Sequence, residues 1–235
     1  MSPVKCQIGF LVKFKEKKYA LDAACRLYSP CTKSKNPKIC FIPTATGDDN
    51  GYINNFYRAF NSLACIPSDI SFFKRTIDLR KHILDQDIIF VGGGNTKSML
   101  AVWREWGLDV ILKEAYDKGV IMSGVSAGAI CWFEQGITDS WSHDLAIMDC
   151  LGFVNVTCCP HYDEEPNRRP FVSRALKNKS IDSCISIEGF NALHLVDDSP
   201  KYSVAFKDNN DTYNVVLKNG EVSEDQIDRV EKIKV

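Results

Sequence analysis

The 235-residue sequence has no long apolar run, no excess of charge of either sign and no internal repeat. No stretch approaches the roughly 18 consecutive apolar residues that span a bilayer, and the apolar patch near the N-terminus is too short for a signal peptide. Lysine and arginine total 29 against 30 aspartates and glutamates, so no basic surface is indicated. We therefore expect a cytoplasmic protein that binds neither nucleic acid nor membrane.

The sequence also lacks the cysteine spacing of a disulfide scaffold or a zinc site. Its ten cysteines lie mostly in apolar runs, such as Cys40 in ICFIP, where free cysteine behaves as a small buried hydrophobe. Cys158, Cys159 and His161 are close in sequence, but adjacent cysteines do not have C-x₂-C spacing and no second pair completes four ligands. We expect no metal and no organic cofactor.

What is present is the composition of an ordinary globular chain, with 45% hydrophobic and 25% charged residues. The length fits a single α/β domain over residues 1–235. Short apolar runs alternate with amphipathic ones, and this alternation predicts a three-layer α/β fold with a mainly parallel central sheet and helices on both faces. The predicted strands are Ile39–Pro43, Ile70–Phe73, Asp87–Val91, Val120–Gly124 and Val154–Cys159, and the predicted helices are 52–63, Thr96–Trp106, Leu108–Lys118 and Ala127–Glu134.

The C-terminal part of the chain has a different pattern. Ala192–Val196, Tyr202–Phe206 and Tyr213–Leu217 alternate with turn clusters such as Asp208–Asp211. Short runs separated by turn residues are typical of antiparallel strands. We expect these strands at one edge of the sheet.

The strongest local signal is the segment Ser123–Ala129, in which a predicted strand ends, Ser126 occupies the turn and a helix begins. Small residues at Gly124, Ala127 and Gly128 allow strand and helix to approach closely, as in a nucleophile elbow. The N–H of Ala127 would then face a developing oxyanion. The alternative is that Ser126 only caps the helix.

A second glycine-rich turn, Gly92-Gly93-Gly94-Asn95-Thr96, also joins a strand to a helix. Free backbone N–H groups in such a turn can bind a phosphate or an oxyanion. The turn has neither G-x-G-x-x-G nor Gly-Lys-Ser/Thr, so it carries no nucleotide fingerprint. Neighbouring parallel strands would bring it beside Ser126, which favours the oxyanion interpretation over phosphate binding or simple helix packing.

A nucleophilic serine needs a base and a group that orients the base. Among the four histidines, His161 is the best candidate, because it follows a predicted strand and Pro160. The orienting carboxylate remains open on chemistry alone, although Glu188 stands out because it ends the strand CISI and precedes Gly189. The other carboxylates in question are Asp139, Asp144, Asp163, Glu164 and Glu165.

Arg168 and Arg169 follow the acidic run Asp163–Glu165. They form either part of a solvated charged loop or a guanidinium that binds a substrate carboxylate. Cys131 is a conceivable nucleophile, but its position within a predicted helix indicates a core residue.

Together these motifs resemble the peptidase E family of serine peptidases, the aspartyl dipeptidases. The segments that carry the resemblance are Val91–Thr96, Gly124–Ala129 and Pro160–Tyr162, in this order and spacing, and the similarity extends from about Ile39 to Val196. The resemblance implies a fold like that of class I glutamine amidotransferases. It also implies a small peptide as substrate, with an N-terminal aspartate, and a monomer or homodimer.

For the site, the resemblance implies Ser126 as nucleophile, His161 as general base and Glu188 as third member, since Glu188–Asn191 matches the family's Glu-Gly-Asn turn. Gly94 and Ala127 would supply the oxyanion N–H groups. Asn95, Arg168 and Arg169 would contact the substrate, with one arginine holding its aspartate carboxylate. The region Gly9–Lys18 departs from the family's glycine-rich turn, which predicts either a rebuilt sheet edge or a poorly ordered segment.

Four other functions remain open for a chain with these residues. A glutamine amidotransferase-like thiol enzyme needs cysteine at the elbow, where this chain has Ser126. A peptidase E-like hydrolase of another substrate class would keep the catalytic residues and change the substrate contacts. A non-catalytic binding module would keep the elbow only as structure, and a phosphate-binding protein would use the Gly92–Gly94 turn.

Overall fold

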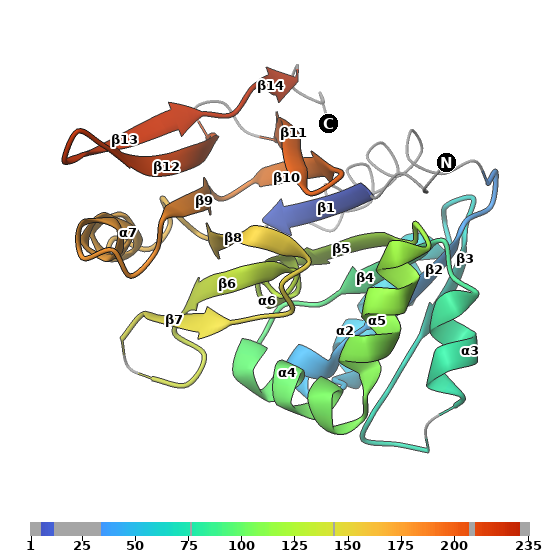
Figure 1. Cartoon of the computed structure of the whole chain (residues 1–235). Coiled ribbons are helices and arrows are strands. Elements are labelled where there is room, and N and C mark those ends of the chain that lie inside the picture. Colours follow the sequence, from blue (N-terminus) through green and yellow to red (C-terminus); the bar gives the residue numbers. More distant parts are fainter. Residues whose placement is uncertain (1–5, 12–33, 76, 143, 207–209, 231–235) are drawn as a thin grey trace.

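Two sheets form the centre of the protein (Figure 1). The computed structural model describes residues 6–11, 34–75, 77–142, 144–206 and 210–230. Among these residues, the first sheet has eight strands in the order β14-β11-β10-β1-β5-β4-β2-β3, and the second has six in the order β13-β12-β9-β8-β6-β7. Residues 12–18 of the atypical N-terminal region lie outside the described residues, whereas its first three residues belong to β1.

The elements follow one another as strand and helix through the first half of the chain and mostly as strands thereafter. The first half comprises β1 (Cys6–Leu11), β2 (Lys38–Ile42), η1 (Thr44–Thr46), α2 (Asn50–Phe60), β3 (Ile66–Asp69), α3 (Leu79–Leu84), β4 (Ile88–Val91), α4 (Thr96–Glu105), α5 (Leu108–Asp117), β5 (Ile121–Val125) and α6 (Ala127–Ile130). The second half comprises β6 (Phe133–Thr138), β7 (Ala146–Asp149), β8 (Val154–Cys159), α7 (Arg168–Lys177), β9 (Ser183–Ile187), β10 (Asn191–Val196), β11 (Ser199–Ala205), β12 (Thr212–Lys218), β13 (Glu221–Gln226) and β14 (Arg229–Val230).

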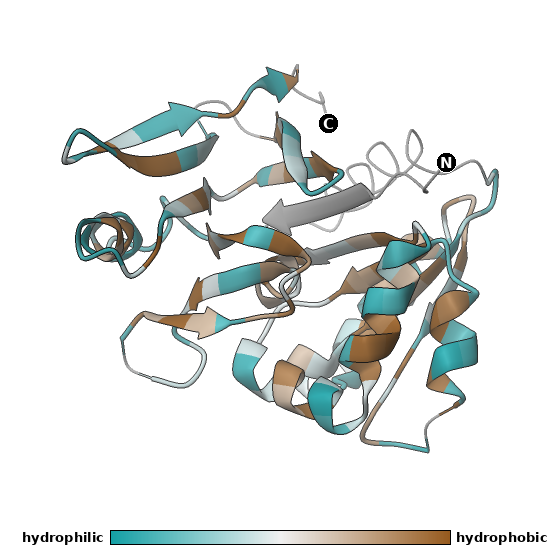
Figure 2. Ribbon diagram, viewed as in Figure 1, coloured by the Kyte–Doolittle hydropathy of each residue, from teal (hydrophilic) through white to brown (hydrophobic). Residues whose placement is uncertain are grey.

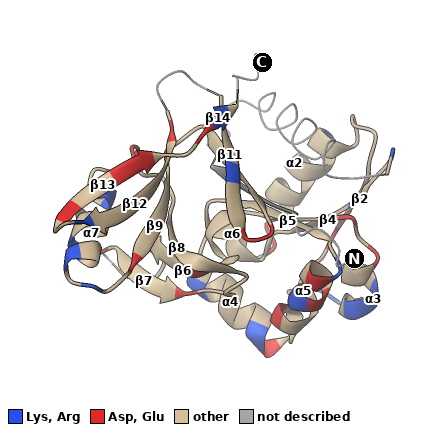
Figure 3. Ribbon diagram, turned by 45° about the horizontal axis from the view of Figure 1, so that its top comes forward, with Lys and Arg blue, Asp and Glu red and all other residues tan. Residues whose placement is uncertain are grey.

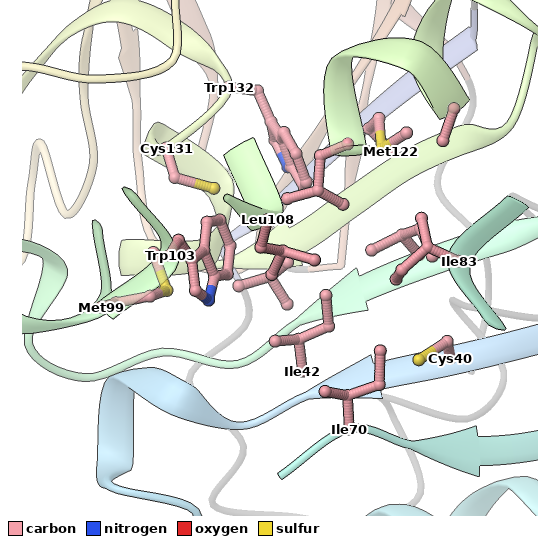
Figure 4. Packing of buried hydrophobic residues seen from close by; sticks show 14 of the residues in the cluster. Cys40, Ile42, Ile70, Ile83, Met99, Trp103, Leu108, Met122, Cys131 and Trp132 are labelled. Carbon is pink, nitrogen blue, oxygen red and sulfur yellow. The ribbon is translucent and has the colours of Figure 1, made fainter. Parts of the chain in front are cut away.

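Helices cover both faces of the parallel part of the first sheet, as the sequence predicts. Side chains of β2 alternate between the two faces because successive residues of a strand point in opposite directions. Ile39 and Phe41 pack with Phe56 of α2, whereas Cys40 and Ile42 pack with residues of α3, α4 and α5. Figure 2 shows the apolar residues gathered on these inner surfaces, and Figure 4 shows the cluster beneath α4 and α5 around Trp103.

Two predicted elements, the third strand of the sheet and the helix after Ser126, have different bounds in the structure. The predicted strand Ile70–Phe73 is wrong, because the strand is β3 and pairing stops at Asp69. The carboxylate of Asp48 accepts hydrogen bonds from the N–H groups of Phe72 and Phe73, at 3.0 Å for Phe73, so these groups are not available to a sheet ladder.

The predicted helix Ala127–Glu134 is too long. The helix α6 ends at Ile130. The carbonyl of Cys131 accepts a hydrogen bond from Leu151 N–H at 3.0 Å, and the carbonyl of Trp132 accepts one from Phe153 N–H at 2.8 Å. Pairing with a distant segment thus replaces the next helical turn, and β6 begins at Phe133.

The predicted C-terminal strands form antiparallel pairs, although β11 also pairs in parallel with β14, and they do not all join one sheet. β10 and β11 extend the first sheet beside β1, whereas β12 pairs with β9 and β13 in the second sheet. The parallel strands β6, β8 and β9 form the rest of that second sheet with the antiparallel β7. The α/β class holds, with a parallel sheet and a mixed C-terminal sheet instead of one central sheet.

The two glycines of the elbow are required by close backbone contacts. A Cβ atom on Gly124 would lie 2.2 Å from the carbonyl oxygen of Gly128, and one on Gly128 would lie 2.2 Å from the carbonyl oxygen of Val91. Both distances are far below van der Waals contact, and the opposing atoms belong to the backbone. Helix α6 therefore approaches β4 and β5 only because these positions have no side chain.

We predict that Gly128→Ala destabilises the protein by about 3 kcal/mol, the upper part of the range for overpacked sites. For a chain of this size, 1 kcal/mol corresponds to a shift of roughly 2–4 °C in Tm. Thermal unfolding followed by circular dichroism measures the effect. A Tm within 2 °C of the wild-type value would contradict the close contact.

No helix within the described ranges combines the length and apolarity needed to cross a membrane.

Candidate active site

Ser126 lies at the carboxyl end of β5 in a backbone conformation that is unfavourable for a side-chain-bearing residue. Its φ is 54° and its ψ is −112°. Non-glycine residues in such regions cost of the order of 1–3 kcal/mol and persist only where the surrounding structure holds them. Ser126 occupies the N-cap position of α6, but its side chain makes no capping hydrogen bond. The capping alternative is therefore wrong, and the hydroxyl is presented above the strand ends.

The glycine turn after β4 lies beside Ser126, as the sequence predicts. β4 and β5 are paired in parallel, with Val91 opposite Gly124. A Cβ atom on Gly93 would lie 3.3 Å from Cβ of Ser126 and 3.9 Å from its Oγ. The turn therefore touches the serine side chain directly.

Of the three glycine N–H groups in this turn, two are already engaged. Gly92 N–H donates to the carbonyl of Ile42 at 3.1 Å, and Gly93 N–H donates to the hydroxyl of Tyr52 at 3.3 Å. No described residue accepts a hydrogen bond from Gly94 N–H. As the first residue of α6, Ala127 also has no intrahelical acceptor for its N–H. Gly94 and Ala127 are the two expected oxyanion donors; Ala127 directly follows Ser126, and Gly94 directly follows Gly93, which lies against the serine side chain.

His161 is the histidine that the structure brings to Ser126. Its Nε2 lies 3.0 Å from Ser126 Oγ. Like the serine, His161 has a positive φ, here 53°. The residue follows β8 in a tight turn in which its carbonyl accepts hydrogen bonds from Glu164 N–H at 3.1 Å and Glu165 N–H at 3.2 Å.

The carboxylate at the other ring nitrogen of His161 is Glu164 and not Glu188. Glu164 Oε2 lies 2.6 Å from His161 Nδ1, and the two side chains are only 16% and 20% exposed. An acceptor-only carboxylate at Nδ1 fixes the imidazole proton there. Nε2 therefore presents its lone pair to the hydroxyl of Ser126, which is the tautomer that a general base requires.

Glu188, which the family resemblance assigns as the third member, lies near this arrangement but has different hydrogen-bond partners. Its carboxylate accepts a hydrogen bond from Asp211 N–H at 2.8 Å and forms an ion pair with Arg169. Burial raises the pKa of Glu188 above its ordinary value, and the Asp211 N–H opposes that shift. The next residue, Gly189, packs against the side chain of Glu164, since a Cβ there would lie 2.7 Å from the Glu164 carboxyl carbon.

The three expected substrate contacts have different surroundings. Asn95 is the N-cap of α4, where its Oδ1 accepts from Ser98 N–H at 2.8 Å, and its Nδ2 donates to the carbonyl of Ser140 at 2.7 Å. Arg168 is buried, and it donates to Glu165 and to the carbonyl of Ile137, both at 2.8 Å. Both side chains thus have structural partners that use their polar groups.

Arg169 is the exposed member of the arginine pair, with 40% of its side chain accessible. Its guanidinium lies 4.3 Å from the centroid of the Tyr162 ring and 5.3 Å from that of Tyr213. The guanidinium also forms ion pairs with Glu188 and Glu224. Since Tyr162 directly follows His161, Arg169 lies next to the turn that carries the base.

Glu164 is one of the carboxylates that the sequence leaves open as the orienting group, whereas Tyr52 and Glu224 are contacts that the sequence does not single out as site residues. Glu164 has a usable signal, because it follows His161 by three residues and lies on the same tight turn. Tyr52 and Glu224 come from α2 and β13, and nothing in their local sequence indicates that they reach the strand ends.

No group of three or more histidine, cysteine, aspartate or glutamate side chains in the described part of the chain is arranged to hold a metal ion. Cys158 and Cys159 are fully buried, and burial raises the pKa of both thiols. Cys131 is likewise buried, beneath α6, and burial raises the pKa of its thiol. These cysteines belong to the core.

A serine on a strained strand-to-helix turn, hydrogen-bonded to a histidine and flanked by free N–H groups, defines the class of α/β proteins with a nucleophile elbow. Comparison with known proteins is consistent with this class. A putative peptidase E from Listeria monocytogenes EGD-e superimposes with a TM-score of 0.63 at 18% identity, covering 84% of this chain and 97% of that chain. A peptidase from an acI-B1 Actinobacterium gives a TM-score of 0.65 at 17% identity, covering 97% and 96%.

Sequence comparison is more specific. The profile of Peptidase family S51 matches residues 12–202. The uncharacterized peptidase YgaJ of Bacillus subtilis strain 168 is 44% identical over 194 residues, which cover 82% of this chain and 84% of the relative. Peptidase E of Shewanella amazonensis is 30% identical over 129 residues, 53% of each chain. The chain belongs to peptidase family S51, the peptidase E family.

Proposed function

We propose that this S51 peptidase hydrolyses small peptides through an acyl-enzyme formed on Ser126, with His161 as general base and Glu164 as the carboxylate that orients it. The observation that carries this proposal is the hydrogen-bonded chain from Ser126 Oγ to His161 Nε2, at 3.0 Å, and from His161 Nδ1 to Glu164, at 2.6 Å. Both Ser126 and His161 have positive φ, so two strained residues converge on one hydrogen bond. Such strain clusters at functional sites.

The reaction follows from these contacts. Ser126 Oγ attacks the carbonyl carbon of the peptide bond while its proton passes to His161 Nε2. The negative charge of Glu164 stabilises the resulting imidazolium. The tetrahedral intermediate then collapses, the C–N bond breaks, and His161 returns the proton to the leaving amine. A water molecule, deprotonated by His161, hydrolyses the acyl-enzyme and restores Ser126.

The N–H groups of Gly94 and Ala127 are the donors for the oxyanion. Gly94 has a backbone conformation that residues with side chains rarely adopt, and Ala127 is the first residue of α6. Both N–H groups are therefore fixed in position before the substrate binds. Loss of one such donor in a preorganised site costs roughly 3–4 kcal/mol of transition-state stabilisation. The hydroxyl of Tyr52 fixes the turn by accepting from Gly93 N–H.

Among small peptides, we propose dipeptides with an N-terminal aspartate as the preferred substrates. Arg169 supports this choice, because its partly exposed guanidinium lies beside the turn that carries His161 and can bind a planar carboxylate. Arg168 does not support it, because its side chain is buried and bonded to Glu165.

The test is hydrolysis of matched dipeptides, Asp-Leu, Asn-Leu, Glu-Leu and Ala-Leu, by the full chain and by Ser126→Ala. We expect Asp-Leu to give the highest kcat/KM and Ser126→Ala to abolish its cleavage. Equal cleavage of all four would reject the aspartate preference and keep the serine chemistry.

Labelling of Ser126 by a fluorophosphonate separates the remaining possibilities. Labelling without cleavage of any dipeptide would indicate a hydrolase of another substrate class. Absence of both labelling and cleavage, in a protein with a normal melting curve, would indicate a binding module.

A further inference from the structure

The guanidinium of Arg169 is already occupied by carboxylates of the protein itself. One Nη donates to Glu188 and the other to Glu224. The rings of Tyr162 and Tyr213 lie against the same group, at 4.3 and 5.3 Å. A guanidinium binds a carboxylate through its N–H edges. An incoming carboxylate therefore competes with these two glutamates for the N–H groups of both Nη atoms.

The two glutamates differ in how firmly they are held. The side chain of Glu188 is 7% exposed and also accepts a hydrogen bond from the backbone N–H of Asp211, the residue before β12. The side chain of Glu224 is 30% exposed and projects from β13, the outer strand of the β12–β13 hairpin. Figure 3 shows this acidic strand close to the basic residues of α7. Glu224 is the partner that can leave without exposing a buried charge.

Glu224 also accepts a hydrogen bond from Tyr162, and this contact indicates which chemical group could take the place of the Glu224 carboxylate. The hydroxyl of Tyr162 donates to Glu224 Oε1 at 2.6 Å, so Glu224 bridges Tyr162 and Arg169. Once Glu224 moves away, both donors lie free beside the turn that carries His161. A substrate carboxylate could take the same two hydrogen bonds, one from a phenol and one from a guanidinium.

We propose that Glu224 is a specificity-determining residue that competes with the acidic side chain of the substrate for Arg169 and Tyr162. This inference rests on the proposed function, in which Arg169 binds that side chain. Glu224 lowers the affinity for aspartate-containing peptides and leaves the chemistry at Ser126 unchanged. Neutral peptides, which do not require the guanidinium, are bound equally well with or without Glu224.

The test measures binding in the non-cleaving background of Ser126→Ala, so that failure of the proposed chemistry does not obscure the result. Titration calorimetry with Asp-Leu and with its neutral isostere Asn-Leu is performed on this protein and on the same protein carrying Glu224→Gln. We expect Glu224→Gln to lower the Kd of Asp-Leu about two- to fivefold, as for loss of a partly exposed competing ion pair, and to leave that of Asn-Leu unchanged.

Glu221→Gln is the matched control, since it removes the same charge from the exposed start of β13. We expect no change in either Kd for this variant. Glu224→Ala provides a second variant with the same expected direction if Glu224→Gln folds poorly. An unchanged or weaker Asp-Leu affinity in folded Glu224 variants, or an equal gain for Asn-Leu, would overturn the proposal.

Two further measurements distinguish failure of the competition proposal from failure of the proposed serine chemistry. If Arg169→Gln leaves the Kd of Asp-Leu unchanged in the Ser126→Ala background, Arg169 does not bind the substrate and the competition proposal falls with it. If Asp-Leu binding depends on Arg169 and Glu224 but fluorophosphonate does not label wild-type Ser126, the competition stands and the serine chemistry fails.

Discussion

Replacement of His161 by alanine is expected to lower kcat by roughly 10⁶-fold, since loss of the base alone removes nearly all the catalysis of a serine triad. The physical reason is that Ser126 Oγ, 3.0 Å from His161 Nε2, has no other base within hydrogen-bonding distance in the described structure. The measurement is turnover of the best dipeptide together with the rate of fluorophosphonate labelling. Both are expected to fall, whereas the melting temperature stays close to that of the wild type.

The protein contains a matched control for this variant. Ser68 Oγ and His82 Nε2 form a second serine–histidine pair at 3.1 Å. Neither residue has a positive φ, and no described carboxylate hydrogen-bonds to His82. His82→Ala is expected to leave kcat and labelling unchanged. A turnover in His161→Ala within tenfold of the wild-type value, or an equal loss in both variants, would contradict the assignment of His161 as the base.

The comparison of the two pairs explains why the elbow is predictable from sequence. The turn at Ser126 can be recognised from the residues around it. A Cβ atom on Gly124 or Gly128 would lie 2.2 Å from a backbone oxygen, so both positions require glycine and the requirement is visible in the local sequence. In the second glycine turn Gly94 has the same property, since a Cβ atom there would lie 2.3 Å from the carbonyl oxygen of Ala45. Because the carboxyl ends of parallel strands meet at one edge, two such local patterns are enough to predict that Ser126 lies beside the Gly92–Gly94 turn.

The sheet arrangement is less accessible from sequence, because it depends on pairing between distant segments. The apolar run after Ala127 is compatible with helix or strand. The choice is made by hydrogen bonds from residues 151–153 to the carbonyls of Cys131 and Trp132. The assignment of β12 to the second sheet is made by its pairing with β9. In both cases the pairing segment lies far along the chain from the segment whose structure it determines, so the local sequence does not predict the pairing.

The carboxylate that we propose as the orienting group of His161 lies between these two cases. Glu164 and Glu188 are neighbours in space, since Gly189 packs on the Glu164 side chain. Which of them reaches His161 depends on the positive φ of His161 and on Arg169, which holds the Glu188 carboxylate. The family resemblance pointed to Glu188, and only the side-chain partners distinguish the two residues.

Glu164→Gln is therefore expected to lower kcat by about 10³–10⁴-fold, the effect of replacing the orienting carboxylate by an amide in serine triads. The amide is nearly isosteric, so it keeps the packing against Gly189. It no longer stabilises the imidazolium, and its NH₂ group can donate to Nδ1 and select the wrong tautomer. KM is expected to change little, because Glu164 contacts His161 and not the substrate.

Glu188→Gln is the discriminating comparison. Its amide oxygen can still accept from Asp211 N–H, but the charge that holds Arg169 is lost. We expect this variant to retain kcat within about tenfold and to alter mainly the KM of aspartate-containing dipeptides, since a partly exposed ion pair contributes little to the free energy. Steady-state kinetics of both variants against Asp-Leu and Ala-Leu measures the split. The opposite result would be a large loss of kcat in Glu188→Gln and a nearly normal kcat in Glu164→Gln. Glu188 would then be the orienting carboxylate during turnover, and the turn that carries His161 would have to rearrange when substrate binds.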